Sequence, residues 1–255
     1  MVVKFYDEIE DSLLKFAVII SRYKGKWVFC KHKARNTFEI PGGHREPGES
    51  IAETAKRELT EEMKLILSSC DFGNPSSARF ISDNLCKPIS ECKVLYFPNE
   101  KVTPEKIKSD KYEARVAAFG FQRKNIYVAN YYDPAPFLNL DIDVIYISGG
   151  NTFGTMKLIR DSGFDKAIID YIHRGVIYIG GSAGAHIATA DISHVAKYDK
   201  DTFGLTDFSG LGLYNGILIC HYTEDRKADF DTLNSLGKYR VISLSDDQSI
   251  VIKDE

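Results

Sequence analysis

Apolar and polar stretches alternate along the chain from residue 63 onward. Short apolar runs rich in β-branched residues predict buried strands. We expect such strands at residues 65–69, 94–97, 126–129, 144–147, 176–179 and 217–220, with weaker candidates at 241–244 and 250–252. Between them, helical patterns cover residues 77–84, 109–119, 152–161, 165–173 and 182–189. This alternation predicts an α/β fold, a doubly wound and mostly parallel sheet with helices on both faces.

The pattern is different in residues 1–62. Two strands are expected at residues 15–21 and 26–31, joined by a turn, and a helix is expected over residues 47–62. Ile51, Ala55 and Leu59 recur on one face of that helix. The sequence therefore predicts two domains, residues 1–62 and residues 63–255.

A serine flanked by glycines follows the apolar run at residues 176–179. Residues 180–185 are Gly-Gly-Ser-Ala-Gly-Ala, so Ser182 has a glycine two positions away on each side. This spacing is typical of a nucleophile elbow, a sharp strand-to-helix turn in which larger neighbours would clash. The turn presents the serine hydroxyl beside backbone N–H groups, which can stabilise negative charge on a substrate oxygen. The alternative is a plain glycine-rich connection.

A second glycine-rich loop follows the apolar run at residues 144–147. Gly149 and Gly150 allow close approach of the backbone, and Thr152 can cap the next helix. Ligands of parallel sheets bind beyond the carboxyl ends of the strands, where both glycine-rich turns are expected. The loop can therefore supply a second N–H donor, or it can be a simple connection.

A nucleophilic serine needs a base, and histidine is the usual one. His221 comes directly after the predicted strand at residues 217–220. An acid should orient that histidine, and Asp199 lies between Ser182 and His221 in the sequence. Four other acids near these residues stay open as alternatives: Asp191, Glu224, Asp225 and Asp247.

Together these motifs resemble the dipeptidase E (aspartyl dipeptidase) family of serine peptidases. The resemblance covers residues 63–255 and rests on the loop at 149–153, the serine turn and the His-Tyr-Thr sequence at 221–223. It implies a class I glutamine-amidotransferase-like fold in which serine replaces the cysteine nucleophile. It also implies a catalytic triad of Ser182, Asp199 and His221.

The same resemblance implies how substrate is held. The backbone N–H groups of Gly150 and Ala183 would form the oxyanion hole, and Gly149, Asn151 and Thr152 would contact the substrate. The implied activity is hydrolysis of small peptides, including dipeptides with N-terminal aspartate, through an acyl-enzyme. That route needs no metal and no cofactor. A member of the family that binds peptides or amino acids without turnover is an alternative.

The predicted helix at residues 47–62 carries a cluster of acids. Spacings of three and four place Glu58, Glu61 and Glu62 on one face, where like charges are unfavourable unless they share a cation such as Mg²⁺. These acids resemble part of the Nudix hydrolase box, although Lys64 stands where that pattern has glycine. The other matching positions are Gly43, Glu49, Arg57, Leu59 and Leu65. We expect a truncated, partial α+β Nudix module, with metal-dependent cleavage of nucleoside diphosphate derivatives as an alternative activity.

Composition narrows the partners of the protein. The 255 residues are 44% hydrophobic and 27% charged, which is ordinary for a globular protein, and the net charge is −3. Without a basic stripe, nucleic acid is not an expected partner. No apolar run reaches membrane-spanning length, no signal-peptide pattern is present, and the five cysteines lack metal-type spacing. We expect a cytoplasmic protein with free thiols and a small-peptide substrate.

Overall fold

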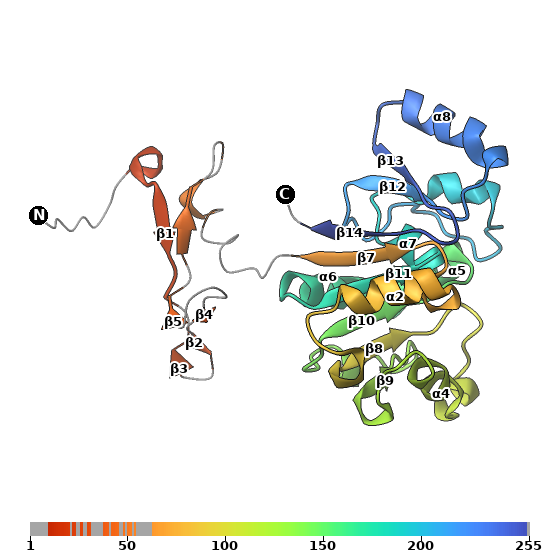
Figure 1. Cartoon of the computed structure of the whole chain (residues 1–255), viewed down its shortest axis with the longest axis horizontal. Coiled ribbons are helices and arrows are strands. Elements are labelled where there is room, and N and C mark those ends of the chain that lie inside the picture. The colour runs from red at the N-terminus through yellow and green to blue at the C-terminus, as the bar shows by residue number, and fades with distance from the viewer. Residues whose placement is uncertain are drawn as a thin grey trace, which may run out of the picture. The chain divides into compact units, whose positions relative to one another are not determined.

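The computed structural model describes residues 10–20, 22–23, 26–27, 30–31, 38–40, 42–45, 48, 50–52, 54 and 63–253. The chain divides into two compact units, Met1–Glu61 and Glu62–Glu255 (Figure 1). Most of the helix predicted over residues 47–62 lies outside the described residues. The same holds for six positions of the Nudix pattern: Glu49, Arg57, Glu58, Leu59, Glu61 and Glu62.

Short antiparallel pairs form the described part of the first unit. After the 3₁₀ helix η1 (Asp11–Leu13), β1 (Phe16–Val18) pairs with β6 (Gly42–His44). The remaining pairs are β2 (Arg22–Tyr23) with β3 (Lys26–Trp27), and β4 (Cys30–Lys31) with β5 (Phe38–Glu39). A Cβ at Gly42 would lie 2.6 Å from the carbonyl oxygen of Ala17, so glycine permits the β1–β6 pairing. β1 thus lies within the first expected strand, and β3 and β4 lie within the second, but among the described residues β1 pairs with β6 and not with β3 or β4.

In the described part of the second unit, the central element is a six-stranded sheet of order β14–β7–β11–β10–β8–β9. Neighbouring strands are parallel, except that β14 runs antiparallel to β7. The strands are β7 (Lys64–Ser68), β8 (Val94–Phe97), β9 (Ile126–Val128), β10 (Val144–Ile147), β11 (Ile177–Gly181) and β14 (Ser249–Lys253). The expected mostly parallel sheet is thus confirmed.

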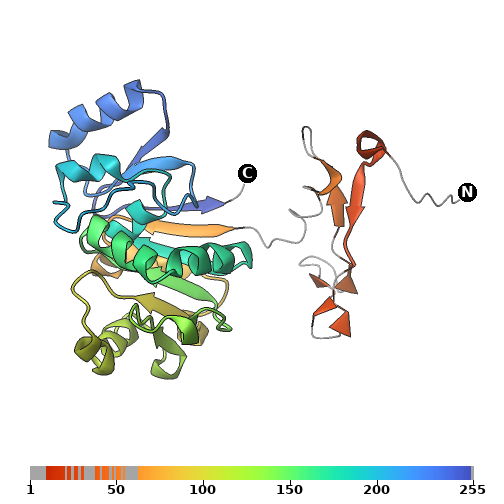
Figure 2. The ribbon, with the colours of Figure 1, turned by 180° about the vertical axis from the view of Figure 1, so that it is seen from behind.

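Helices lie on both sides of this sheet. In Figure 1, α2 lies in front of the strands, and from behind, in Figure 2, α5 and α6 lie in front of them. The α-helices are α2 (Pro75–Asp83), α3 (Pro104–Lys108), α4 (Lys111–Ala117), α5 (Thr152–Asp161), α6 (Phe164–His173), α7 (Ala183–Ile187) and α8 (Lys227–Ser235). The described 3₁₀ helices of this unit are η2 (Asp71–Gly73), η3 (Ile89–Glu91), η4 (Arg123–Asn125), η5 (Ala135–Phe137), η6 (Ser193–Lys197) and η7 (Glu224–Arg226).

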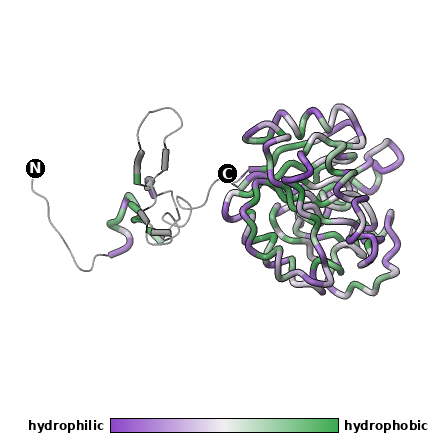
Figure 3. The backbone as a smooth tube through the Cα atoms, turned by 90° about the horizontal axis from the view of Figure 1, so that it is seen from below, coloured by the Kyte–Doolittle hydropathy of each residue, from purple (hydrophilic) through white to green (hydrophobic). Residues whose placement is uncertain are grey.

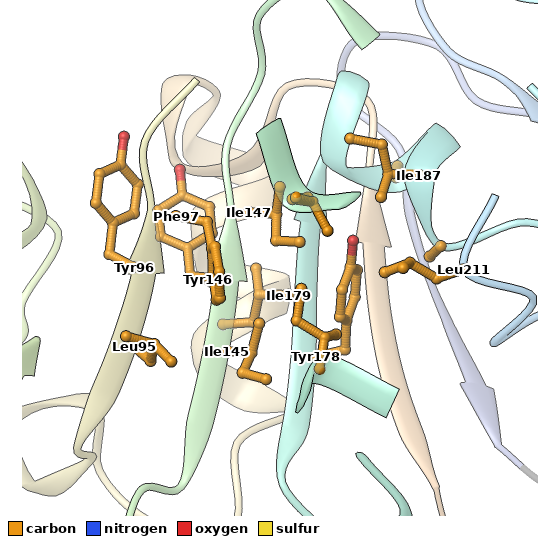
Figure 4. Packing of buried hydrophobic residues seen from close by; sticks show 14 of the residues in the cluster. Leu95, Tyr96, Phe97, Ile145, Tyr146, Ile147, Tyr178, Ile179, Ile187 and Leu211 are labelled. Atoms are coloured by element: carbon orange, nitrogen blue, oxygen red, sulfur yellow. The ribbon is translucent and has the colours of Figure 1, made fainter. Parts of the chain in front are cut away.

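The core gathers around the central strands β10 and β11. Apolar residues run through the interior of the second unit (Figure 3), and Ile145, Tyr146 and Ile179 are completely buried there (Figure 4). A strand covered on both faces has no solvent side, so its sequence is an unbroken apolar run and not an alternating one. This double burial explains why the apolar runs located these strands so closely.

Two strands leave the main sheet. β12 (Gly216–Ile219) and β13 (Arg240–Ser243) form a separate parallel pair, so the expectation that residues 217–220 join the central sheet is wrong. Ile217 and Ile219 pack with Val241 in a second small cluster, while Leu218 faces the main core. Burial on both faces again produced an apolar run, and such a run does not say which sheet the strand enters.

Two helical segments differ from the expected ones. The helix predicted over residues 109–119 corresponds to α4 alone, whereas α3 precedes the predicted range and was not expected. Ser109, with an extended backbone conformation, ends α3 and separates the two helices. α8 has no fully buried residue, so its sequence carries no strong apolar stripe and it escaped prediction.

Candidate active site

Ser182 occupies a strained turn between β11 and α7. Its φ of 48° and ψ of −106° lie where a non-glycine residue is uncommon. Small neighbours make this turn possible. A Cβ at Gly180 would lie 2.6 Å from the carbonyl oxygen of Gly184, and a Cβ at Gly184 would run into the carbonyl oxygen of Ile147. The Ser182 N–H donates to the carbonyl oxygen of Ser68 at 2.9 Å, which ties the turn to β7.

His221 lies beside the serine. Its Nε2 is 2.8 Å from the Ser182 Oγ, so the predicted pairing of these two side chains is present in the structure. His221 follows the end of β12 with a φ of 53°, and its backbone N–H donates to the Ser69 Oγ at 2.7 Å. Two strands thus position the His221 ring. β12 leads directly into His221, and β7 leads into Ser69, whose hydroxyl accepts the His221 N–H.

The acid next to His221 is Asp246. The His221 Nδ1 lies 2.6 Å from the Asp246 Oδ1, and the Ser69 Oγ donates to the same oxygen at 3.3 Å. The hydrogen bond with His221 holds the pKa of the Asp246 carboxyl below its usual range. A carboxylate at Nδ1 favours the tautomer with the proton on Nδ1, which leaves Nε2 free to accept a proton from Ser182.

Asp199 has a different place, so the expectation that it orients His221 is wrong. Its Oδ2 accepts the backbone N–H of Thr152 at 2.8 Å, at the start of α5. A carboxylate there satisfies an N–H that has no partner within the helix. Asp199 thereby fastens the segment after η6 to the glycine-rich loop.

The loop from Gly149 to Thr152 lies beside the serine. A Cβ at Gly149 would be 3.4 Å from the Ser182 Cβ, so the loop backbone passes close to the hydroxyl. Both polar atoms of the Asn151 side chain have partners within the protein. Its Oδ1 accepts the Gly154 N–H at 3.0 Å and so caps α5, and its Nδ2 donates to the carbonyl oxygen of Lys200 at 3.0 Å. Thr152 is fully buried. The side chains of Asn151 and Thr152 therefore shape the loop.

Two backbone amides near the serine remain available. Gly150 and Ala183, the expected oxyanion donors, have no acceptor for their N–H groups within the described part of the chain. Ala183 is the first residue of α7, where an N–H has no partner inside the helix. Ala183 is buried, and a buried amide without a partner is unfavourable, so its N–H suits an incoming acceptor oxygen. Gly150 is exposed, so its N–H is accessible to the same oxygen.

Two other histidines of this unit have structural roles. Burial lowers the pKa of His186 to about 3, so its ring is neutral at physiological pH. Its Nε2 accepts the Cys220 N–H at 3.4 Å. His194 is also buried, and its Nε2 lies 2.6 Å from the carbonyl oxygen of Leu218.

A thiol completes the surroundings of the histidine. The Cys70 Sγ lies 3.9 Å from the His221 Nδ1, in the segment between β7 and η2. Burial, with the nearby Asp246 carboxylate as a further cause, raises the pKa of the Cys70 thiol to about 11. Among the described residues, Cys70, His221 and Asp246 form a group whose ligand atoms could hold a metal ion.

Sequence reasoning missed Asp246, Ser69 and Cys70 as neighbours of His221. Asp246 could have been found from strand pairing, since it follows β13 just as His221 follows the parallel neighbour β12. Ser69 and Cys70 likewise follow β7, which pairs with β11. Nothing in the local sequence around the two residues distinguishes them.

Comparison with known proteins gives consistent matches over the second unit. The sequence profile of peptidase family S51 matches residues 65–255, a span that leaves out most of the Nudix-like pattern. An uncharacterized peptidase of Listeria innocua is 32% identical over 123 residues, which cover 44% of this chain and 56% of that protein. A peptidase E of Escherichia coli O1:K1 is 34% identical over 81 residues, which cover 32% of this chain and 34% of that protein. The chain spans about half the length of the first curated relatives it matches.

Two solved structures share the fold. One is of a protein described as a candidate peptidase E from Listeria monocytogenes, with a TM-score of 0.59 and 21% identity over 76% of this chain and 96% of that one. The other is a peptidase from an acI-B1 actinobacterium, with a TM-score of 0.53 and 16% identity over 76% of this chain and 85% of that one. Separately, none of the helices among the described residues is long and apolar enough to cross a membrane.

Proposed function

The chain belongs to peptidase family S51, and on that basis we propose that it is a serine peptidase acting on small peptides. Ser182 is the nucleophile, His221 the general base, and Asp246 the acid that orients the imidazole. The observation that carries this proposal is the line of hydrogen bonds Ser182 Oγ–His221 Nε2 at 2.8 Å and His221 Nδ1–Asp246 Oδ1 at 2.6 Å. Nucleophile, base and orienting group within hydrogen-bond reach are the geometric signature of covalent acyl transfer.

The proposed reaction follows from the positions of these groups. His221 Nε2 takes the proton of Ser182 as the hydroxyl oxygen attacks the scissile carbonyl carbon, and Asp246 stabilises the imidazolium that forms. The N–H groups of Gly150 and Ala183 donate to the oxyanion of the tetrahedral intermediate. His221 then protonates the leaving amine. In the second half of the reaction His221 takes a proton from water as the water attacks the acyl group, and it returns the proton to Ser182 as the serine leaves.

Support for the oxyanion site comes from the loop and the turn together. Gly149 brings the loop next to Ser182, and the amides of Gly150 and Ala183 lack acceptors among the described residues. Donors that are already in place need no reorganisation when charge develops, which is where such sites gain most of their effect. We also propose the finer fold assignment, a doubly wound class I glutamine-amidotransferase-like domain, on the basis of helices on both sheet faces and the turn after β11.

The decisive test is active-site labelling of the full chain with a fluorophosphonate, comparing the wild type with Ser182→Ala. We expect one labelled site in the wild type, located at Ser182 by peptide mapping, and no labelling of the variant. A thermal melt of both proteins shows whether the variant is folded. Labelling that persists in folded Ser182→Ala would refute the assignment, as would a folded wild type that does not react.

Substrate class is tested next on a panel of dipeptides. The curated relatives include proteins named peptidase E, and we propose that Asp-X dipeptides are the first members of the panel to try. Hydrolysis that survives EDTA but is lost in Ser182→Ala is the expected result. Turnover of a nucleoside diphosphate derivative that requires Mg²⁺ and survives Ser182→Ala would instead favour the Nudix alternative.

A further inference from the structure

Three different metal-ligating side chains meet at the side of the His221 ring that faces away from Ser182. The Cys70 Sγ, the His221 Nδ1 and an Asp246 carboxylate oxygen all lie within 4.8 Å of one another. In the proposed function only His221 and Asp246 take part, so Cys70 has no assigned role. Each of the three comes from a segment that directly follows a strand of the second unit: β7, β12 or β13. The strands fix the three backbones, and the group is not a chance meeting of mobile loop tips.

The spacing of the ligand atoms is close to that of a tetrahedral zinc site. With Zn–S near 2.3 Å and Zn–N or Zn–O near 2.0 Å, tetrahedral angles place sulfur and nitrogen about 3.5 Å apart, and nitrogen and oxygen about 3.3 Å apart. Here the Cys70 Sγ is 3.9 Å from the His221 Nδ1, and the Asp246 Oδ1 is 2.6 Å from it. Relative to Nδ1, the carboxylate would withdraw and the thiol would approach, each by less than about 1 Å, and the sulfur–oxygen separation, now within 4.8 Å, would become about 3.5 Å. Rotation of the side chains can supply such shifts.

The chemistry of the set selects a borderline or soft divalent ion. Thiolate and imidazole ligands suit Zn²⁺, whereas Mg²⁺ and Ca²⁺ prefer oxygen ligands only. The side chains of His221 and Asp246 are 40% and 64% exposed, which leaves an entry path and room for a water as fourth ligand. Ser69 hydrogen-bonds the Asp246 carboxylate and accepts the His221 backbone N–H, as outer partners of metal ligands do.

We propose that Cys70, His221 and Asp246 form an inhibitory site for Zn²⁺ or a similar thiophilic ion. The inference rests on the proposed function, because the ion would bind His221, the general base of that reaction. On binding, the Cys70 thiol loses its proton to solvent and the sulfur bonds the ion. The His221 Nδ1 lone pair and one Asp246 oxygen complete the protein ligands.

Inhibition follows from the two nitrogens of one ring. When Nδ1 binds the ion, the single proton of the neutral imidazole moves to Nε2. A protonated Nε2 donates to the Ser182 Oγ and cannot accept its proton. Asp246 is drawn away from its hydrogen bond with His221 at the same time. The serine therefore loses its base while the loop from Gly149 to Thr152 and the amide of Ala183 are not displaced, so the ion should lower turnover more than peptide affinity.

The experiment uses the full chain and has two independent measurements. The first is fluorophosphonate labelling with added Zn²⁺, with Mg²⁺ in a parallel series, followed by EDTA. The second is the thiolate-to-metal charge-transfer absorption of added Co²⁺, which needs no enzymatic activity. The key variant is Cys70→Ser, with Cys70→Ala as a second one, and the matched control is Cys86→Ser at an exposed free cysteine.

We expect Zn²⁺ to block labelling of the wild type and of Cys86→Ser, EDTA to restore it, and Mg²⁺ to have no effect. In the Cys70 variants the Zn²⁺ concentration for half-inhibition should rise at least about tenfold, since even outer-partner substitutions weaken metal binding by about 10–100-fold. The Co²⁺ thiolate band should be present in the wild type and absent from the Cys70 variants.

Two results would overturn the proposal: equal Zn²⁺ sensitivity of the Cys70 variants and the wild type, or a cobalt thiolate band that persists without Cys70. If the wild type does not label at all but shows a cobalt band that depends on Cys70, the metal site stands and the proposed peptidase function fails. The two hypotheses are thus separated by the same set of proteins.

Discussion

Replacing Asp246 with asparagine tests which acid serves the histidine. The substitution keeps the size of the side chain and removes its charge. The Asp246 Oδ1 lies 2.6 Å from the His221 Nδ1, so the centres of the carboxylate and of an imidazolium are about 4 Å apart. At that separation the interaction is about 1 kcal/mol in bulk water and about 4 kcal/mol at an effective dielectric constant of 20.

Exposure decides where in that range the effect falls. The Asp246 side chain is 64% exposed, so solvent screens much of the interaction, and we take about 2–3 kcal/mol. Since each 1.36 kcal/mol is a factor of ten in rate, Asp246→Asn should react with a fluorophosphonate roughly 10²-fold more slowly than the wild type. The amide can also donate to Nδ1 and force the proton onto Nε2, which acts in the same direction.

The assay is the second-order rate of labelling, which needs no knowledge of the natural peptide. Asp199→Asn is the matched control, because it makes the same chemical change at the acid first expected from the sequence. Its Oδ1 can still accept the Thr152 N–H, so the labelling rate should stay within about threefold of the wild type. A slow Asp199→Asn together with a fast Asp246→Asn would refute the geometric argument.

Three further predictions concern stability and the loop. Gly184→Ala should destabilise the protein by about 1–3 kcal/mol in thermal unfolding, because the new Cβ meets the carbonyl oxygen of Ile147, whereas a stability equal to the wild type would contradict this clash. Burial raises the folded-state pKa of Asp71, so ionisation removes stability as the pH rises from about 4 through that raised value. Asp71→Asn should therefore gain melting temperature relative to the wild type over that pH range, and a difference that is independent of pH would contradict the reasoning. Asn151→Ala should lose about 0.5–2 kcal/mol of stability together with labelling rate, since the cap of α5 is removed, and unchanged values of both would show that the cap is dispensable.

Local sequence located the parts of the site that depend on chain neighbours. Ser182 was found because the turn between β11 and α7 requires glycine at specific offsets, and those glycines stand next to the serine in the chain. His221 was found because it follows an apolar run directly. In both cases the physical constraint acts over a few residues, so it leaves a mark that a single sequence displays.

Asp246 escaped because its position depends on a pairing between distant strands. In the β12–β13 pair, Ile219 stands opposite Ser243, and His221 and Asp246 follow these two residues at the same end of the pair. Nothing near Asp246 in the sequence records that β13 lies beside β12 and not in the central sheet. Asp199 was the natural choice by order along the chain, and only the fold shows that its carboxylate is engaged at α5.

The two helices that start beside the serine use their first amides in opposite ways. At α5 the N–H groups of Asn151 and Thr152 are already taken by the carboxylates of Glu100 and Asp199, each at 2.8 Å. At α7 the N–H of Ala183 has no acceptor among the described residues. Catalysis gains only from interactions that are stronger in the transition state than in the ground state. An anion already in the substrate would meet like charge at α5, whereas the charge that develops on the scissile carbonyl would find an unused donor beside Ser182. In the proposed reaction the arrangement therefore reserves its free amides for the moment at which the oxyanion forms.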